Sequence, residues 1–514
     1  MFSVVNEQWI KTYRGEIEAF SKTISAFQAG EIDKKAYKGM SGGMGSYAQR
    51  DPSRHMLRLR MPGGRMTVER LGFLAQTVER YQVQKLKLTT CETVQLHNLE
   101  AWQVPEIMEQ AISCGILCKG GGGDNPRNVM CSPLSGTQAG EAFDVLSWAE
   151  AVTAYLLSIC RDIHMPRKLK IAFCNGVDDC VHTAFRDMGF QAQPDGTFSL
   201  RIAGGLGANH RMGVLVDEAI PASQILYYVK AMIDTFCTHG NYQNRAKART
   251  RYLQETLGEA LKPVYLASVA AAKAAGGLDL ELKPTVICKT GTETLDDPRA
   301  LPQKQPGLYT VQYHPIGGSL PLDKPAALYA LLKDMPDVEC RIAPNETLYI
   351  LNLTAEEARQ VLSATADGAQ TEFEYSVACI GASICQQGVR DSQGLLQAAV
   401  AAVREANLPD GSLPKVCISG CPSSCAAHQA GAIGFQGCVR LVDKKPLPAF
   451  KMFLGGSDDL GAARFGEPVA TILERDIPAL LVELGQAAAA SGLKWSQWIG
   501  GNQDAFQSIL AKYA

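Results

Sequence analysis

Hydrophobic and polar positions follow two periods along this chain, and the same succession of periods occurs twice. A strand-like stretch ending in two glycines, LRLRMPGG (57–64), precedes an amphipathic helix pattern, LGFLAQTVERY (71–81). A second strand-like stretch and a second helix pattern, VPEIMEQAISCG (104–115), follow. Residues 311–367 repeat this order with VQYHPIGG, AALYALLKDM and AEEARQVLSATAD. Each copy is typical of a small α+β unit of the ferredoxin-like type.

Identical residues at a constant offset of 254 (residue 317 against residue 63) indicate an internal duplication. They are Gly63-Gly64 with Gly317-Gly318, Glu92-Thr93 with Glu346-Thr347, and Asn98-Leu99 with Asn352-Leu353. The segments behind these units correspond more loosely: GGLGANHRMG followed by Ile220-Pro221 matches GGSDDLGAARFG followed by Ile477-Pro478. We therefore expect two halves, each with a small α+β unit and a larger α/β unit. A cleft between such halves suits a large cofactor.

The length of the chain, 514 residues, is too great for one hydrophobic core. The predicted segments are an N-terminal extension (1–50), a first ferredoxin-like half-domain (51–118), a first α/β domain (119–261), a connection (262–300), a second ferredoxin-like half-domain (301–368) and a second α/β domain (369–514). The predicted fold class is an internally duplicated α+β fold.

Composition and charge exclude several classes of function. Apolar residues make up 46% and charged residues 20% of the chain, and the formal net charge of −2 gives no basic surface for nucleic acid. The N-terminal sequence has no signal-peptide pattern, and no apolar stretch is long enough to span a membrane. Sixteen cysteines without an export signal favour a reducing compartment, so we expect a cytoplasmic protein whose thiols serve a metal centre.

Four cysteines in the C-terminal third have the spacing of an iron–sulfur site. They are Cys379 and Cys385 in CIGASIC, and Cys421 and Cys425 in SGCPSSC. A cubane cluster needs four soft thiolates in one small volume, and two short-spaced pairs supply them with one long loop to close. Gly420 and Pro422 flank the first cysteine of the second pair and allow the backbone to turn tightly around a bulky core.

Core packing is the alternative for these cysteines, because free cysteine is among the most buried residue types. A second set has comparable spacing: Cys114 and Cys118 in CGILC, with Cys174 and Cys180 in CNGVDDC. The glycine and proline around the C-terminal set favour it as the cluster site. CGILC lies in an apolar stretch typical of a helix end, so we interpret the N-terminal set as mainly structural.

The C-x5-C and SGC-x3-C pattern resembles that of the sirohaem-containing sulfite and nitrite reductases, and the resemblance runs over about residues 50–510. It implies a 4Fe–4S cluster held by the four C-terminal cysteines, with Cys425 also bridging the cluster to the sirohaem iron. It also implies two halves with pseudo-twofold symmetry around a cofactor cleft. Residues 119–261 would then bind sirohaem and substrate, and residues 369–514 would bind the cluster and sirohaem.

Four cations of the first half match anion-binding positions of that family. They are Arg60 in LRLRMPGG, Arg127 in NPRNVMC, and Lys168 and Lys170 in MPRKLKIAF. In LRLR and RKLK, charged and apolar residues alternate, so on a strand the two cations of each motif share one face. Converging cations would bind a small dianion such as sulfite and supply protons as its oxygens leave as water. Taken singly, each motif is more typical of a solvated strand face, and the second copy has His314 in place of Arg60.

Sirohaem carries several carboxylates, which need partners when buried. The resemblance extends to NRAKARTRY (244–252), where Arg245 and Arg249 would lie on one face of a helix, with a solvated helix as the alternative. The run GGGGDNPRN (120–128) lacks the features of a phosphate loop. We interpret it as a backbone approach to the macrocycle that positions Arg127, with Asn128 as a further cofactor contact.

Three positions depart from the family pattern. Cys91 stands where an arginine is usual in LTTCETVQLH, Ala432 replaces an acidic residue in AIGF, and Tyr242 stands where an arginine is common in GNYQNR. These departures predict a divergent branch with a modified substrate preference.

The predicted reaction is the six-electron reduction of sulfite to sulfide at a sirohaem coupled to a 4Fe–4S cluster. In the family, nitrite-preferring enzymes tend to have asparagine at the position of Lys170, so the lysine favours sulfite. Nitrite reduction to ammonia on the same centre is the first alternative. A precorrin monooxygenase of cobalamin synthesis and a non-enzymatic electron-transfer or cluster-scaffold protein are the others. The chain has no flavin or nicotinamide fingerprint, so we expect a ferredoxin or a separate flavoprotein subunit to supply electrons.

Overall fold

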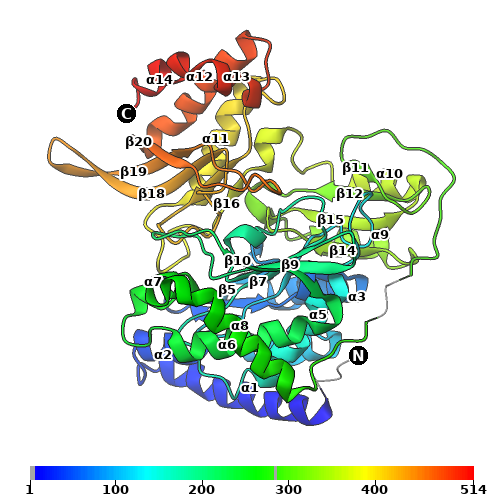
Figure 1. The fold of residues 1–514 in the computed structure, drawn as a ribbon. Helices are drawn as coiled ribbons and strands as arrows, with labels where there is room; N and C mark the ends of the chain where they lie inside the picture. The colour runs from blue at the N-terminus through cyan, green and yellow to red at the C-terminus, as the bar shows by residue number, and fades with distance from the viewer. Residues whose placement is uncertain (1–5, 283–285) are drawn as a thin grey trace.

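Two similar halves make up the molecule (Figure 1). The structure is a computed structural model that describes residues 6–282 and 286–514. This part of the chain folds into four five-stranded sheets, of which two are antiparallel and two are mixed. The predicted α+β class and the predicted duplication are both confirmed.

The two antiparallel sheets have equivalent strand orders. The first contains, from edge to edge, β1 (Ser46–Ala48), β2 (His55–Leu59), β5 (Val94–Leu99), β4 (Lys85–Leu88) and β13 (Ser319–Leu320). The second contains β11 (Ala300–Pro302), β12 (Tyr309–Tyr313), β15 (Leu348–Leu353), β14 (Glu339–Ile342) and β3 (Arg65–Thr67). The first unit also contains helices α3 (Val68–Tyr81) and α4 (Gln103–Ala111), and the second contains α9 (Lys324–Leu332) and α10 (Ala355–Ala364). One continuous hydrophobic core joins both units.

Each antiparallel sheet takes its last strand from the other half. β3 leaves the first unit and pairs with β14, whereas β13 leaves the second unit and pairs with β4. Both strands follow the repeated Gly-Gly turns at 63–64 and 317–318. Gly64 has a φ of +70°, and a Cβ there would lie 2.3 Å from the Ile342 carbonyl oxygen, so only glycine fits where the chain crosses over. The two units are therefore interlocked.

The two mixed sheets also share one topology. The first contains β10 (Val214–Pro221), β9 (Thr197–Ile202), β8 (Met188–Ala192), β7 (Ile171–Cys174) and β6 (Met130–Cys131). The second contains β20 (Glu467–Leu473), β19 (Lys445–Leu454), β18 (Ile433–Val442), β17 (Val416–Ser419) and β16 (Val377–Ala378). In both sheets the first three strands along the chain are parallel, and the last two continue antiparallel.

Strand register relates the two mixed sheets residue by residue. Ile171 lies opposite Met188 and Val416 lies opposite Ile433, which gives a constant offset of 245 (residue 416 against residue 171). For the first strands of the two sheets, β6 and β16, the offset between equivalent residue numbers is 247 (residue 377 against residue 130). These offsets identify the counterpart of each residue in the other half.

Helices accompany both mixed sheets. The first has α5 (Leu146–Ile159), α6 (Ile225–His239), α7 (Leu253–Thr256) and α8 (Leu261–Ala275), and the second has α11 (Ser392–Glu405), α12 (Ile477–Ala490), α13 (Trp495–Gly501) and α14 (Gln503–Leu510). The predicted match of Ile220-Pro221 with Ile477-Pro478 is wrong, because the first dipeptide ends β10 and the second begins α12. Tyr265 and Val269 of α8 lie in the core, so the connection between the halves begins after this helix. None of the helices in the described ranges combines the length and the apolar character needed to cross a membrane.

The N-terminal segment packs into the first half. Helix α1 (Glu7–Gln28) places Trp9, Tyr13, Ile17 and Phe20 along one face, and these side chains enter the core of the ferredoxin-like units. The Tyr13 hydroxyl accepts a hydrogen bond from the Cys118 N–H (3.1 Å). Helix α2 (Lys34–Gly43) contacts α1 and leads into β1. The first 50 residues thus contribute helices and an edge strand to the first half.

Candidate active site

The four predicted cluster cysteines follow neighbouring strands. Cys379 follows β16, Cys421 and Cys425 follow β17, and Cys385 lies in the loop between β16 and α11. Because β16 and β17 are parallel, their carboxyl ends meet at one edge of the sheet. The Gly420 N–H donates a hydrogen bond to the Cys379 sulfur (3.2 Å).

Three of these thiols influence one another. Cys425 is exposed at the surface, but the surrounding protein desolvates its thiol and raises its pKa to about 12, and the Cys379 and Cys421 thiols contribute in the same direction. Lys168 and Lys170 act in the opposite direction on the Cys425 thiol. The predicted lysines of the first half therefore lie within electrostatic range of Cys425, a predicted cluster cysteine of the second half.

Cys385 lies on a surface loop. The Arg50 guanidinium donates hydrogen bonds to the carbonyl oxygens of Cys385 (3.3 Å) and Gly388 (2.8 Å), which holds this loop against the β1–β2 turn. No three His, Cys, Asp or Glu side chains of the described ranges lie close enough to share one metal ion. A cubane cluster does not need that arrangement, because each of its four thiolates binds a different iron. Four thiols near one sheet edge, with an N–H directed at a sulfur, fit such a cluster.

Cations without carboxylate partners lie next to Cys425. Lys168 and Lys170 precede β7, and neither ammonium group forms an ion pair with a carboxylate in the part of the chain described here. Burial lowers the pKa of Lys168, and Lys170, Arg249 and Arg127 lower it further. This uncompensated positive charge suits a small anion.

Arg60 lies behind this group of cations. Its guanidinium donates hydrogen bonds to the carbonyl oxygens of Lys119 (2.9 Å) and Arg127 (3.0 Å), and the residue is 2% exposed. Burial lowers the pKa of Arg60 to about 10. Strand β2 ends at Leu59, one residue before Arg60. The strand alternation that would put the Arg58 and Arg60 side chains on one face therefore stops before Arg60. Arg58 instead acts on Cys91 and Arg127 at the site.

The predicted helix carrying Arg245 and Arg249 is wrong. Residues 245–247 form a 3-10 turn, and Arg249 has an extended backbone (φ −79°, ψ 154°), so the two side chains do not share a helix face. Arg245 pairs with Asp124 near the surface (2.8 Å), and Arg249 pairs with the buried Asp187 (2.9 Å). Both arginines therefore already have acidic partners.

Unused buried donors nevertheless remain around the site. The Nε atoms of Arg127, Arg249 and Arg251 are buried and have no hydrogen-bond partner among the described residues. An N–H of a guanidinium forms strong hydrogen bonds with carboxylates. These donors fit a macrocycle that carries carboxylates.

Cys91 and Tyr47 face the same site. Burial alone would raise the pKa of Cys91, but Lys170 and other cations lower it to about 6. Burial would also raise the pKa of Tyr47, but the positive charge of Arg127 lowers it. Asn128, the predicted cofactor contact, donates its side-chain N–H to the Cys91 carbonyl oxygen (3.1 Å) and supports this turn. Cys91 was visible in the sequence as a departure, whereas nothing in the sequence marked Tyr47.

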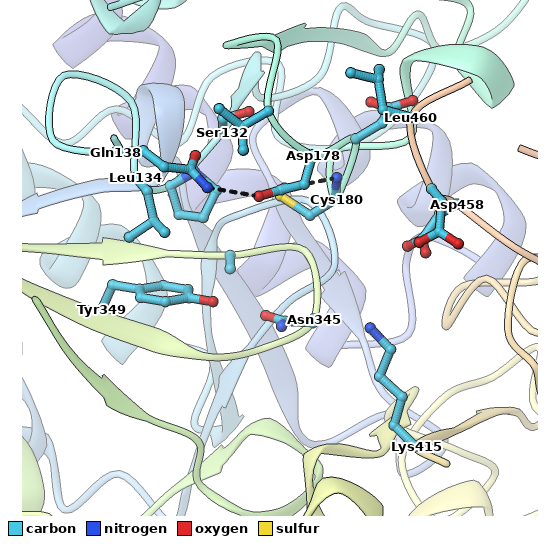
Figure 2. A pocket seen from close by; sticks show the side chains of 15 residues that line it. Ser132, Leu134, Gln138, Asp178, Cys180, Asn345, Tyr349, Lys415, Asp458 and Leu460 are labelled. Carbon is cyan, nitrogen blue, oxygen red and sulfur yellow. Dashed lines mark hydrogen bonds between the residues drawn. The ribbon is translucent and has the colours of Figure 1, made fainter. Parts of the chain in front are cut away.

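A cavity of about 460 Å³ lies at the counterpart position in the other half, and we call it the mirror cavity (Figure 2). By the offsets given above, Ser132 corresponds to Cys379, Cys180 to Cys425, Lys415 to Lys170 and Asn345 to Cys91. Figure 2 shows the Lys415 side chain pointing into this cavity toward Asn345 and Asp458. Asp458 accepts a hydrogen bond from His182 (2.9 Å) and raises the pKa of Lys415. The mirror cavity keeps the framework but has a carboxylate beside its lysine.

The N-terminal cysteine set is divided between separate cores. Cys118 is buried in the core of the ferredoxin-like units, whereas Cys174 is buried in a small separate cluster. Cys180 packs against that small cluster and lines the mirror cavity. This separation supports the structural interpretation of the set.

Two family models match the first half of the chain. Residues 47–113 match the nitrite/sulfite reductase ferredoxin-like half domain, and residues 122–260 match the nitrite and sulphite reductase 4Fe-4S domain. The cysteine quartet lies in the second half, which strand register relates to the matched one.

Relatives cover most of the chain. The ferredoxin–nitrite reductase of Synechococcus elongatus is 27% identical over 455 residues, which are 84% of this chain and 86% of that protein. Sulfite reductase (ferredoxin) 1 of Mycolicibacterium paratuberculosis is 25% identical over 462 residues, which are 83% of this chain and 80% of that protein. The structure of the Mycobacterium tuberculosis NirA protein shares the fold, with a TM-score of 0.77 over 92% of both chains and 23% identity.

The matched domains and the named relatives together indicate an iron–sulfur oxidoreductase. The matched domains and the named relatives support the family of sulfite and nitrite reductases that carry sirohaem and a 4Fe–4S cluster. The predicted family, enzyme class and cofactors are confirmed.

Proposed function

We propose that this protein reduces sulfite to sulfide with six electrons. The observation that carries the proposal is that Lys168 and Lys170, two ammonium groups with no carboxylate partner among the described residues, act electrostatically on the Cys425 thiol, one of the proposed cluster ligands. Sirohaem and the cluster, when bound, would supply single electrons for this reduction. We assign Cys379, Cys385, Cys421 and Cys425 as the cluster ligands.

The cations of the site bind the anion and move protons. Sulfite consumes six electrons and six protons as its three oxygens leave as water, so proton supply matters as much as charge. The lowered pKa of Lys168 brings its ammonium group nearer to neutral pH, where a proton donor is most effective. Lys170, Arg127 and Arg58 compensate the negative charge of the oxygens. We propose Arg58 for the role that the sequence pattern gave to Arg60.

Nitrite is the second candidate substrate, and one observation favours it. Cys91, with its pKa lowered to about 6, is a thiolate at neutral pH and cancels part of the charge of Lys170. A site with less positive charge discriminates less strongly in favour of a dianion. Relatives with either printed substrate name match this chain at similar identity.

A ferredoxin is the proposed electron donor. The names of the similar proteins from Synechococcus elongatus and Mycolicibacterium paratuberculosis both include ferredoxin. A separate flavoprotein subunit is the alternative donor, and steady-state rates with each purified donor decide between them.

The ultraviolet–visible spectrum of anaerobically purified protein, with its iron and acid-labile sulfide content, tests the centre. We expect a tetrapyrrole Soret band and about five irons per chain, four in the cluster and one in sirohaem. A cluster without the tetrapyrrole, from cells able to make sirohaem, would contradict the reductase and favour the precorrin monooxygenase.

A further inference from the structure

We propose that Asp187 is a positioning residue for the anion site: its buried carboxylate fixes the main chain of Lys170 and the guanidinium group of Arg249, and thereby the place where the Lys170 ammonium group meets the substrate. This inference rests on the proposed function, which assigns Lys170 to substrate binding. Asp187 is 0% exposed, so it acts on the substrate only through the residues that it holds.

The Asp187 carboxylate directly precedes β8 and is fully used by its neighbours. Its Oδ2 accepts hydrogen bonds from the Lys170 main-chain N–H (2.8 Å) and from the Arg249 guanidinium (2.9 Å). Its Oδ1 accepts a second bond from Arg249 (3.0 Å) and one from the Thr250 hydroxyl. The Lys170 carbonyl oxygen in turn accepts the Met188 N–H (3.2 Å). Residues 187 and 188 therefore hold Lys170 at both its N–H and its carbonyl oxygen.

Asp187 holds Lys170 without neutralising its side chain. The negative charge of Asp187 is compensated by its ion pair with Arg249, whereas the Lys170 ammonium group has no ion pair with a carboxylate in the described ranges. A buried carboxylate is costly unless it is paired and hydrogen-bonded, and Asp187 meets both conditions. A free ammonium group on a fixed main chain suits a small anion, because a displacement of about 1 Å at a substrate-positioning group can lower the rate by about 100-fold.

The other half lacks this carboxylate. At the offset of 245, Ala432 stands in place of Asp187, and Lys415 stands in place of Lys170. The Lys415 side chain points instead toward the Asp458 carboxylate (Figure 2). One copy of the framework therefore holds its lysine by the main chain and leaves the ammonium group free, whereas the other copy compensates the ammonium group and has no carboxylate behind the main chain.

Two double variants isolate the contact between Asp187 and Lys170. Asp187→Asn/Arg249→Gln keeps a side-chain oxygen for the Lys170 N–H, whereas Asp187→Leu/Arg249→Gln has a similar shape and no acceptor. Both lack the buried charge pair, so they differ only in this hydrogen bond. Sulfite binding to the oxidised holoenzyme, followed by the sirohaem absorption spectrum, is expected to be about 5-fold weaker in the leucine variant than in the asparagine variant. The KM for sulfite is expected to rise with it, and kcat to change less.

A merely structural role would not depend on the lysine side chain. The same two double variants are therefore compared in a Lys170→Ala background, in which Lys168 is retained to bind the anion. The 5-fold difference is expected to disappear there, because Asp187 acts through the Lys170 ammonium group. No difference when Lys170 is present, or an equal difference in both backgrounds, would overturn the proposal.

Further variants keep the test decisive. Ala432→Leu, the matched change beside Lys415, is expected to leave sulfite binding unchanged, and an equal weakening there would also overturn the proposal. If the leucine variant does not fold, Asp187→Ala/Arg249→Gln replaces it, because the other half accommodates alanine at this position. A wild-type protein that contains no cluster and no sirohaem would instead contradict the proposed function, a result that the iron content and the absorption spectrum distinguish.

Discussion

The cluster side of the molecule and the mirror cavity are built on the same strands in the same register, yet they differ in charge. On the cluster side, Cys425 follows β17 and Lys170 directly precedes β7. Beside the mirror cavity, Cys180 follows β7 and Lys415 directly precedes β17. Lys170 has no carboxylate partner in the described ranges, whereas Lys415 faces Asp458. The duplicated framework therefore occurs twice, and a few side chains decide which copy has a lysine without a carboxylate partner among the described residues.

The mirror cavity also shows why its lysine is unsuited to anions. Burial alone would raise the pKa of Asp458, but the hydrogen bond from His182 and the charge of Lys415 hold it well below its usual range. Asp458 is thus ionised at neutral pH and compensates Lys415. At the proposed active site the corresponding charge is left for the substrate.

The largest expected effect comes from the paired cysteines. Cys425→Ser is expected to lower sulfite or nitrite reduction by more than about 100-fold, because even changes outside the first ligand sphere of a metal cost about 10–100-fold. Cys180→Ser, the counterpart beside the mirror cavity, is expected to leave activity and iron content unchanged. Turnover, iron and acid-labile sulfide are measured on both variants, and equal losses would refute the assignment of the two sides.

The shared framework predicts equal costs at the two crossover glycines. Gly64→Ala and Gly318→Ala are each expected to destabilise the protein by about 2 kcal/mol, because both residues have positive φ and both Cβ positions are blocked. Gly492→Ala has the same φ strain (+71°) in open space and is expected to cost about half as much. Thermal unfolding of the three variants checks this order. A much smaller loss for one crossover glycine would show that the two halves do not depend on the exchange equally.

Substrate preference sharpens the comparison of the two lysines. Lys170→Asn is expected to lower the ratio of kcat/KM for sulfite to that for nitrite by about 10-fold, since a hydrogen bond to a charged group contributes about 1.5–3 kcal/mol and a dianion depends on it more. Lys415→Asn is the matched control and is expected to leave the ratio unchanged. An unaltered ratio in Lys170→Asn would remove this lysine from substrate selection.

The smallest expected effect is that of Cys91, the counterpart of Asn345. At pH 8 the Cys91 thiolate opposes Lys170, so Cys91→Ser is expected to raise the sulfite/nitrite ratio of kcat/KM by about 3-fold. Below pH 6 the wild-type thiol is protonated, and the two proteins are expected to converge. Comparing variant with wild type at each pH removes the effect of the substrate's own protonation. A difference that does not change with pH would contradict a charge effect.

The amino-acid sequence by itself determined the duplication, the fold class and the chemistry of the centre. The repeated Gly-Gly, Glu-Thr and Asn-Leu pairs reflect local requirements of backbone conformation. Positive φ, where few residue types are stable, is adopted by Glu92, Asn98, Glu346 and Asn352. The cysteine spacing was equally readable, because metal ligation needs particular residue types at short separations.

Only the tertiary structure decided which side chains face the site. Arg58 and Arg60 are two residues apart and chemically identical, and what separates them is the end of β2 and the loop of residues 119–127 that Arg60 supports. The exchange of β3 and β13 was equally hidden, because each strand is too short to show which sheet it joins. Contacts between residues more than 200 positions apart, such as Lys87 with Glu346, arise from packing of the two halves, and no local pattern encodes them.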